Sequence, residues 1–218
     1  MPKETFINLP GEKRQRIIDI AMEEFSLNNY KSASLSSIVE KAGIAKGSMY
    51  QYFKNKKDLY LYLLNIAAQK KFSFLRDNLR WGEDFFQTLK ALHLTGLKFD
   101  LTNPRYSGLL VLAAAEDDQD IQDFYGELIK QSDAFFLDLV EAGQAAGELR
   151  SDISRKLICF MLNRISLLVA EYLTVRYEFS YADLINYGFA NLPLEMETIE
   201  EELSQIITLL REGFQIQR

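Results

Sequence analysis

The sequence of 218 residues predicts an all-α fold, with a small N-terminal three-helix domain that contains a helix-turn-helix and a larger helical domain after it. Apolar residues recur at intervals of three and four along most of the chain, as on one face of a helix. No stretch alternates between apolar and polar residues for long enough to indicate a strand. Loop-forming residues at 102–104 and 147–152 break the helical pattern. We expect the domain boundary to separate residues 1–55 from residues 56–218.

The first predicted helix extends from about Leu9 to Leu27. Its apolar stripe is the expected packing face of an amphipathic helix and consists of Ile17, Ile18, Ala21, Met22 and Phe25. The basic residues Lys13, Arg14 and Arg16 gather near its start. They form a solvated face or, beside a DNA-binding unit, a set of phosphate contacts that carry no sequence information.

The helix-turn-helix unit, residues 34–53, has the sequence SLSSIVEKAGIAKGSMYQYF. The apolar face of its first helix consists of Leu35, Ile38, Val39 and Ala42. Ser34 precedes this face and can cap the helix, because its hydroxyl accepts a backbone N–H that otherwise lacks a partner. Gly43 follows the face and can adopt the left-handed conformation that ends a helix.

The second helix of the unit has an outer face suited to contact with DNA. Met49 and Phe53 lie four residues apart and point inward. The outer residues supply a cation, hydroxyls, an amide and a glycine that permits close approach; they are Lys46, Gly47, Ser48, Tyr50, Gln51 and Tyr52. None of them is acidic, and lysines follow at positions 54, 56 and 57. All-α proteins that bind no DNA also contain such helix pairs, so spacing alone leaves both interpretations open.

The run AGIAKGSMYQYFKNKKDLYLYLL, residues 42–64, resembles the signature of the TetR family of bacterial transcriptional repressors. The resemblance is gapless, and it covers the first part of the chain only. It fits at Ala42, Gly43, Ile44, Lys46, Gly47, Ser48, Met49, Tyr50, Tyr52, Phe53, Lys56, Asp58 and Leu59. Ala45 departs from the pattern, because the family usually has Ser or another capping residue there. The loss of that capping side chain weakens the start of the second helix by about 1 kcal/mol.

The resemblance implies a dimeric repressor that binds a palindromic operator and that a ligand releases. Phosphates are then expected at Lys56, Tyr50 and the backbone near Gly47. Base edges are expected at Gln51, Lys46 and Ser36. Ser34, Ser48 and Tyr52 complete the predicted set of DNA-contacting residues. An activator or architectural DNA-binding protein without a small-molecule inducer is the alternative.

The distribution of charge agrees with DNA contact near the N-terminus. The whole chain has a formal net charge of −6. Residues 1–58 nevertheless hold ten Lys/Arg against seven Asp/Glu, whereas the remainder holds fifteen against twenty-four. A basic segment attracts the duplex, and the acidic remainder is expected to stay off it.

Helical spacing continues through the rest of the chain. Residues 56–80 predict one long helix that joins the first domain to the second, and the resemblance makes its tilt the mechanical link by which a ligand alters DNA affinity. Beyond Trp81 the pattern predicts five or six further helices, with six candidate ranges. They span residues 83–101, 105–116, 121–146, 154–178, 181–191 and 197–212.

Two of these helices carry more apolar surface than one packing face needs. The helix at 154–178 is apolar nearly all round, so it must be covered on two sides. The helix at 197–212 has an apolar stripe and acidic first turns, which suit the positive end of the helix dipole. Both complete one subunit's core or, as the resemblance implies, form a four-helix homodimer interface. We expect the dimer, because two recognition helices can then meet successive major grooves.

The resemblance also implies an effector cavity among the middle helices. From Phe72 onward the chain holds nineteen aromatic residues, most of them ordinary core. Pockets are mostly apolar with a few polar anchors. The candidate anchors are His93, Asn163 and Arg164, although His93 also fits a hydrogen-bonded packing residue. We expect a hydrophobic or aromatic effector, with a fatty-acyl compound as the alternative.

The composition speaks against an enzyme. One histidine and one cysteine, without nucleophile-elbow, P-loop or zinc-ligand spacing, predict no catalytic site, metal or cofactor. Cys159 lies in an apolar run and is expected to be a small buried hydrophobe. No uninterrupted apolar run reaches the roughly 18 residues of a membrane span, and the first residues lack the apolar stretch of a signal peptide. We therefore expect a cytoplasmic protein with no membrane partner.

Overall fold

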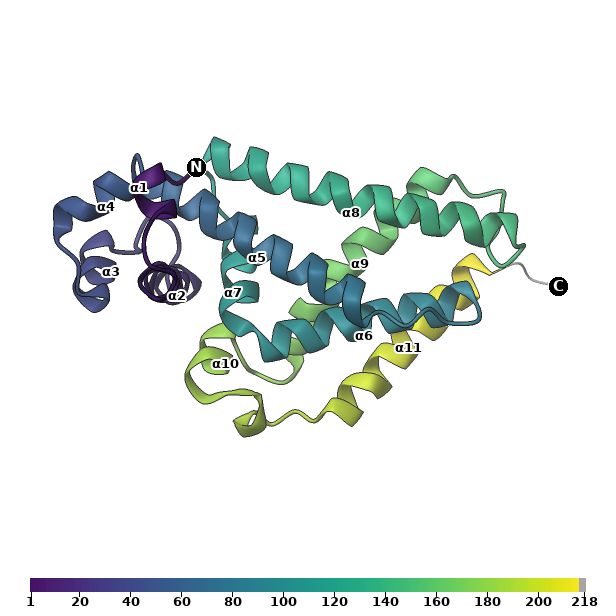
Figure 1. Cartoon of the computed structure of the whole chain (residues 1–218). Coiled ribbons are helices and arrows are strands. Elements are labelled where there is room, and N and C mark those ends of the chain that lie inside the picture. The colour runs from purple at the N-terminus through teal and green to yellow at the C-terminus, as the bar shows by residue number, and fades with distance from the viewer. Residues whose placement is uncertain (216–218) are drawn as a thin grey trace. The chain divides into compact units, whose positions relative to one another are not determined.

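The computed structural model describes residues 1–215 and folds them into helices joined by short loops (Figure 1). The helices are α1 (Glu4–Ile7), α2 (Gly11–Leu27), α3 (Leu35–Ala42), α4 (Lys46–Tyr52), α5 (Lys56–Asn78), α6 (Phe85–Thr102), α7 (Pro104–Ala114), α8 (Gln119–Ala145), α9 (Arg155–Arg176), α10 (Tyr181–Tyr187) and α11 (Met196–Phe214). Within these residues the β pairing is an isolated bridge between Leu149 and Gln215. The predicted all-α fold class is confirmed.

The helix ends follow local chemistry. At the predicted 181–191 element, α10 stops at Tyr187 because Gly188 has φ 77°, outside the helical region, and a short 3₁₀ turn, Phe189–Asn191, follows. Ser180 and Asp183 form a capping box at the start of α10. The Ser180 side chain accepts from the Asp183 amide, and the Asp183 carboxylate accepts from the Ser180 amide. Helix α1 was not predicted, because four residues are too few to show a period.

The chain packs into two compact units. The N-terminal unit contains residues 1–73 and 103–125, and the C-terminal unit contains residues 74–102 and those from 126 onward. Helices α5 and α8 therefore contribute to both units. The predicted division into domains 1–55 and 56–218 concerns function and stays a prediction.

The core of the N-terminal unit explains why the helix-turn-helix is rigid. Phe25 of α2, Ile38 of α3, Met49 of α4 and Leu63 of α5 are all buried in one cluster. Leu109, Ala113 and Ile121, from α7 and the start of α8, are buried in the same cluster. Apolar side chains of α2, α5, α7 and α8 thus fix α3 and α4, which are too short to be stable alone.

The C-terminal unit has two apolar clusters. One joins α6, α8, α9 and α11 around Leu89, Val140, Leu162 and Leu203. The other gathers around Leu173, Leu184 and Ile199. Cys159 is buried in the first, as predicted, and its thiol donates to the Asp133 carbonyl at 3.3 Å.

Helix α9 combines a buried face with an exposed apolar one. Its exposed apolar residues are Leu157, Phe160, Met161, Leu167, Leu168, Tyr172 and Val175. By length and composition alone α9 could cross a membrane, and it is the one such helix within residues 1–215. A helix that fills a protein interior or an interface has the same composition, so this feature alone indicates no membrane.

Candidate nucleic-acid interface

The helix-turn-helix is formed by α3, the turn at residues 43–45, and α4. The Ser34 hydroxyl accepts the Ser37 amide at 3.2 Å and caps α3, as predicted. Gly43 ends the helix with φ 65°, a conformation that other residues adopt at a cost. The Ile44 amide then donates to the Val39 carbonyl. Ala45 makes no side-chain cap to α4, which agrees with its departure from the family pattern.

A buried carboxylate that sequence reasoning missed holds the start of α3. Glu24 of α2 is 8 % exposed, and its oxygens accept the Ser34 amide at 2.8 Å and the Ser37 hydroxyl at 2.9 Å. The Lys41 ammonium lies 3.9 Å from the same carboxylate. Glu24 stands seven residues after Ile17 and three after Ala21, so helical spacing places it on the buried side of α2, and this was the available sign of its burial. These contacts tie the orientation of α3 to α2.

Most of the predicted DNA-contacting residues lie on the surface of the unit. Ser36 of α3 and Lys46, Gly47, Tyr50 and Gln51 of α4 are exposed. Ser34 and Ser48 are half-buried. A side chain at Gly47 would meet no atom within 4 Å, so the backbone there is open to close approach. The outer face of α4 carries no acidic residue.

Tyr52 and Lys56 are placed differently from the others. Tyr52 is only 6 % exposed and packs on Phe6, with ring centroids 5.6 Å apart. The Lys56 ammonium donates to the Lys31 carbonyl at 3.2 Å and lies 4.9 Å from the centre of the Tyr30 ring. Burial lowers the pKa of Lys56, against the attraction of nearby carboxylates. The protein itself therefore already contacts the Lys56 ammonium.

Two carboxylates near the start of α8 pair with Lys57, another basic residue of the N-terminal unit. The Lys57 ammonium lies 2.9 Å from Asp118, in the turn between α7 and α8, and 2.6 Å from Asp120, in the first turn of α8. The hydrogen bond from Lys57 lowers the pKa of Asp118. Lys31 forms a similar pair with Asp117. The basic excess counted from the sequence is thus partly compensated inside the N-terminal unit.

The predicted effector anchors lie in the C-terminal unit. His93 is buried, with Nδ1 2.8 Å from the Leu89 carbonyl and Nε2 3.0 Å from the Ser166 hydroxyl. Asn163 accepts from the Ser132 hydroxyl at 2.8 Å and donates to the Asp133 carboxylate. Since residues 163 and 166 lie one turn apart on α9, the structure brings His93 and Asn163 into one polar region.

Arg164 lies apart from the other two anchors. It is exposed, and its guanidinium lies 5.4 Å from the centre of the Phe160 ring, on the apolar face of α9. The open hollows on α11 and beside the Gln144–Arg155 loop are lined by other residues.

Comparison with known proteins points to gene regulation. Residues 17–63 match the family described as bacterial regulatory proteins, tetR family. A TetR family transcriptional regulator from Chloroflexus aurantiacus J-10-FL, known from its crystal structure, has 36 % sequence identity and a TM-score of 0.82, and the match covers 100 % of each chain.

Two curated relatives come from Bacillus subtilis (strain 168). The uncharacterized HTH-type transcriptional regulator YvdT is 31 % identical over 136 residues, which are 60 % of this chain and 68 % of YvdT. The fatty acid metabolism regulator protein is 35 % identical over 79 residues, which are 36 % of this chain. The chain spans only 38 % of that second relative's length. All three similar proteins are named as regulators and not as enzymes.

Proposed function

The chain belongs to the TetR family of bacterial transcriptional regulators, and from that premise we propose a ligand-released repressor that binds a palindromic operator as a homodimer. The observation that carries the proposal is the outer face of α4. There, exposed Lys46, Gly47, Tyr50 and Gln51 stand on a helix whose inner residues are buried in a packed core. Such a protein works in the cytoplasm, where the chromosome is.

In this proposal α4 is the recognition helix and lies in the major groove. Lys46 and Gln51 are long enough to bond base edges, and Ser36 of α3 joins them. Tyr50 and the open backbone at Gly47 contact phosphates, with Ser34 and Ser48 beside them. Lys56 reaches a phosphate only by leaving the Lys31 carbonyl. Because its side chain is buried, we leave Tyr52 out of the interface.

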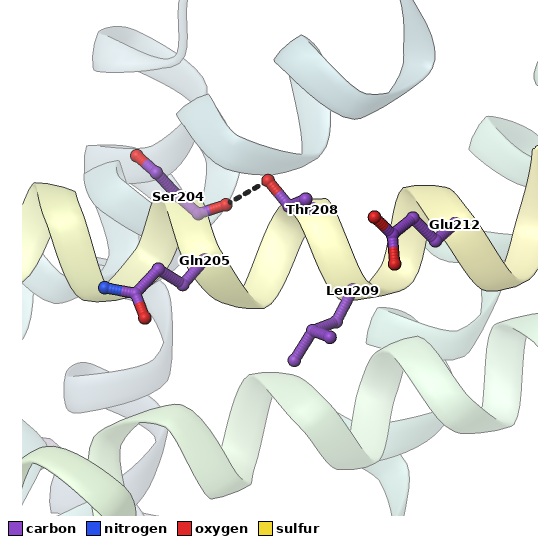
Figure 2. Close-up of a pocket in the computed structure, with 5 residues that line it drawn as sticks. All are labelled: Ser204, Gln205, Thr208, Leu209 and Glu212. Carbon is purple, nitrogen blue, oxygen red and sulfur yellow. Dashed lines mark hydrogen bonds between the residues drawn. The ribbon is translucent and has the colours of Figure 1, made fainter.

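The dimer forms through α9 and α11, within the predicted ranges 154–178 and 197–212. On α9, Leu157, Phe160 and Leu168 are each more than half exposed, as is Leu209 on α11. Figure 2 shows the open hollow beside Leu209, lined by Ser204, Gln205, Thr208 and Glu212. An exposed apolar face of this extent marks a protein interface. Arg164, stacked on Phe160, belongs to this face and not to an effector pocket.

The effector binds among α6, α8 and α9, near His93 and Asn163. These polar groups lie among the apolar side chains of the first C-terminal cluster, and a ligand that enters would exchange their present partners for its own. Repression ends when the effector favours a dimer whose recognition helices no longer match the groove spacing, which requires different affinities for the two states. The name of the fatty acid metabolism regulator makes a fatty-acyl effector the first to try.

Operator binding is tested with DNA from the protein's own genomic surroundings. Lys46→Ala should weaken binding to the preferred fragment about tenfold, as for one base contact. Lys98→Ala, which removes an equally exposed lysine from α6, is the matched control and should change affinity less than about twofold. Fluorescence anisotropy measures both. If the two variants bind alike, or if the unaltered protein prefers no fragment at low ionic strength, the proposed interface is wrong.

Release is tested on the same complex. Palmitoyl-coenzyme A and naringenin represent the fatty-acyl and the aromatic classes, and butyryl-coenzyme A controls for the headgroup. Release by palmitoyl-coenzyme A alone assigns the fatty-acyl class, and release by naringenin alone assigns the aromatic class. If neither releases the DNA at concentrations that shift the protein's melting temperature, the activator or architectural alternative replaces the repressor.

A further inference from the structure

The first residues of the chain turn back to the C-terminal end of α4 (Figure 1). The Lys3 amide donates to the Tyr52 carbonyl at 2.8 Å. The Lys3 ammonium donates to the Tyr50 carbonyl at 2.8 Å, and the Thr5 hydroxyl donates to the Gln51 carbonyl. The last carbonyls of a helix have no partner within it. Here three successive ones find partners in a segment more than forty positions away in the sequence.

An aromatic anchor fixes this segment. Phe6 of α1 is fully buried, and its ring centroid lies 4.7 Å from that of Phe53 and 5.9 Å from that of Tyr62. It thereby fills the space under the end of α4 and the start of α5. The Phe6 amide donates to the Lys3 carbonyl at 2.9 Å, so the short turn that carries the anchor also places Lys3 and Thr5.

These contacts matter because α4 is weak at its other end. It has seven residues, too few to persist without tertiary support. Ala45 gives it no side-chain cap at the start. The carbonyls held by Lys3 and Thr5 belong to Tyr50 and Gln51, whose side chains are exposed on the outer face.

We propose that residues 3–6 form a clasp that fixes the last turn of α4, and that Lys3 and Thr5 are positioning residues for operator recognition. The clasp sets the direction of the Tyr50 and Gln51 side chains without contact between Thr5 and DNA. This role rests on the proposed function of α4 as the recognition helix. The existence of the clasp in the free protein does not depend on DNA.

Conservative variants test the clasp. Thr5→Val keeps the shape of the side chain and removes the hydroxyl, and Lys3→Met keeps the length and removes the ammonium. Thr5→Ser restores the hydroxyl. Thr102→Val is the matched control, because the exposed Thr102 of α6 also donates its hydroxyl to a helix carbonyl, that of Lys98, at 2.6 Å. All three positions are exposed or half-buried, so the variants should fold.

The first measurement is amide hydrogen exchange of residues 46–53 in the free full-length protein. Two hydrogen bonds of ordinary strength correspond to a change of about thirtyfold in the opening of the last turn. We expect the double variant Lys3→Met with Thr5→Val to exchange about thirtyfold faster there. Thr5→Ser and Thr102→Val should exchange as the unaltered protein does. Unchanged exchange in the double variant overturns the clasp.

The second measurement is the ratio of affinities for preferred and unrelated DNA. A loosened α4 should lower this ratio while the salt dependence of binding in Thr5→Val stays the same. If Thr5→Val lowers affinity for all DNA alike and reduces the salt dependence, the residue contacts the backbone and the positioning role is wrong. If the unaltered protein prefers no DNA, the proposed function fails, and the exchange measurement alone still decides whether the clasp exists.

Discussion

His93, the one histidine of the sequence, gives a pH test of the interior of the C-terminal unit. Its Nδ1 lies 2.8 Å from the Leu89 carbonyl, which can only accept, so Nδ1 carries a proton. In the neutral ring Nε2 accepts, and the Ser166 hydroxyl, 3.0 Å away, gives its single proton either to Nε2 or to the Leu162 carbonyl at 2.9 Å. Protonation would turn Nε2 into a donor toward the same oxygen. Charging the ring therefore costs mainly the desolvation of the imidazolium.

Burial lowers the pKa of His93 below its ordinary value of 6.5, and the hydrogen bond to Leu89 opposes this only in part. Just below pH 6.5, His93 binds a proton in the unfolded chain but stays neutral in the folded chain. The contribution of His93 to the free energy of unfolding is therefore complete above about pH 6.5, and it is lost as the pH falls toward the pKa of His93 in the folded chain. One proton per chain gives a slope of at most about 1.4 kcal/mol per pH unit.

Urea unfolding between about pH 7.5 and pH 5.5 measures this slope above the range in which ordinary carboxylates titrate. We expect the free energy of unfolding to fall on acidification in the unaltered protein and to stay nearly level in His93→Gln, whose amide has no charge to gain. Ser166→Ala is the second control, because it keeps the histidine and should keep the slope. Equal slopes in His93→Gln and the unaltered protein, or a rise in stability on acidification, would refute the assignment of a buried neutral ring.

Three further predictions concern stability and assembly. Glu24→Ala should lower the free energy of unfolding by about 3 kcal/mol, because two hydrogen bonds to a charged acceptor are lost, whereas Glu24→Gln should lose only about 1 kcal/mol; equal losses in urea unfolding would contradict the role of the carboxylate. Tyr60→Phe should raise the free energy of unfolding by about 1 kcal/mol and the melting temperature by roughly 2–4 °C, since the Tyr60 hydroxyl is buried without a partner among the described residues. A lower melting temperature would mean that the hydroxyl is bonded. Leu168→Glu should give monomers in sedimentation, whereas Val111→Glu, at an exposed apolar position on α7, should leave the dimer intact. Dimers in both variants would place the interface elsewhere.

Helix positions could be predicted because their signals are local. Ser34 and Gly43 mark the two ends of α3, and the cap and the left-handed glycine lie where the sequence places them. The inward direction of Met49 and Phe53 follows from their spacing alone. The fold class follows from the repetition of such signals along the chain.

Contacts between distant segments could not be predicted in the same way. Phe6 and Ile7 are neighbours in the sequence, and nothing near them shows that Phe6 is buried under α4 while Ile7 is half exposed. Lys57 has the position of a phosphate-binding lysine, but its partners are carboxylates some sixty residues later in the chain. Tyr52 stands three residues after the inward Met49, so spacing allowed an inward position, but the ring of Phe6 on which Tyr52 packs comes from a distant segment. Periodicity identifies a face of a helix, whereas the partner of that face is a property of the tertiary structure.

The support of α4 affects how DNA-binding variants must be interpreted. Helix α3 is held at its start by Glu24, and α4 is held at its end by Lys3, Thr5 and Phe6. A substitution at any of these positions can weaken operator binding without removing a contact to DNA. Affinity alone therefore does not identify the residues at the interface. Salt dependence does separate the two cases, because each lost phosphate contact lowers the number of released counterions, and a misplaced helix does not in itself change that number.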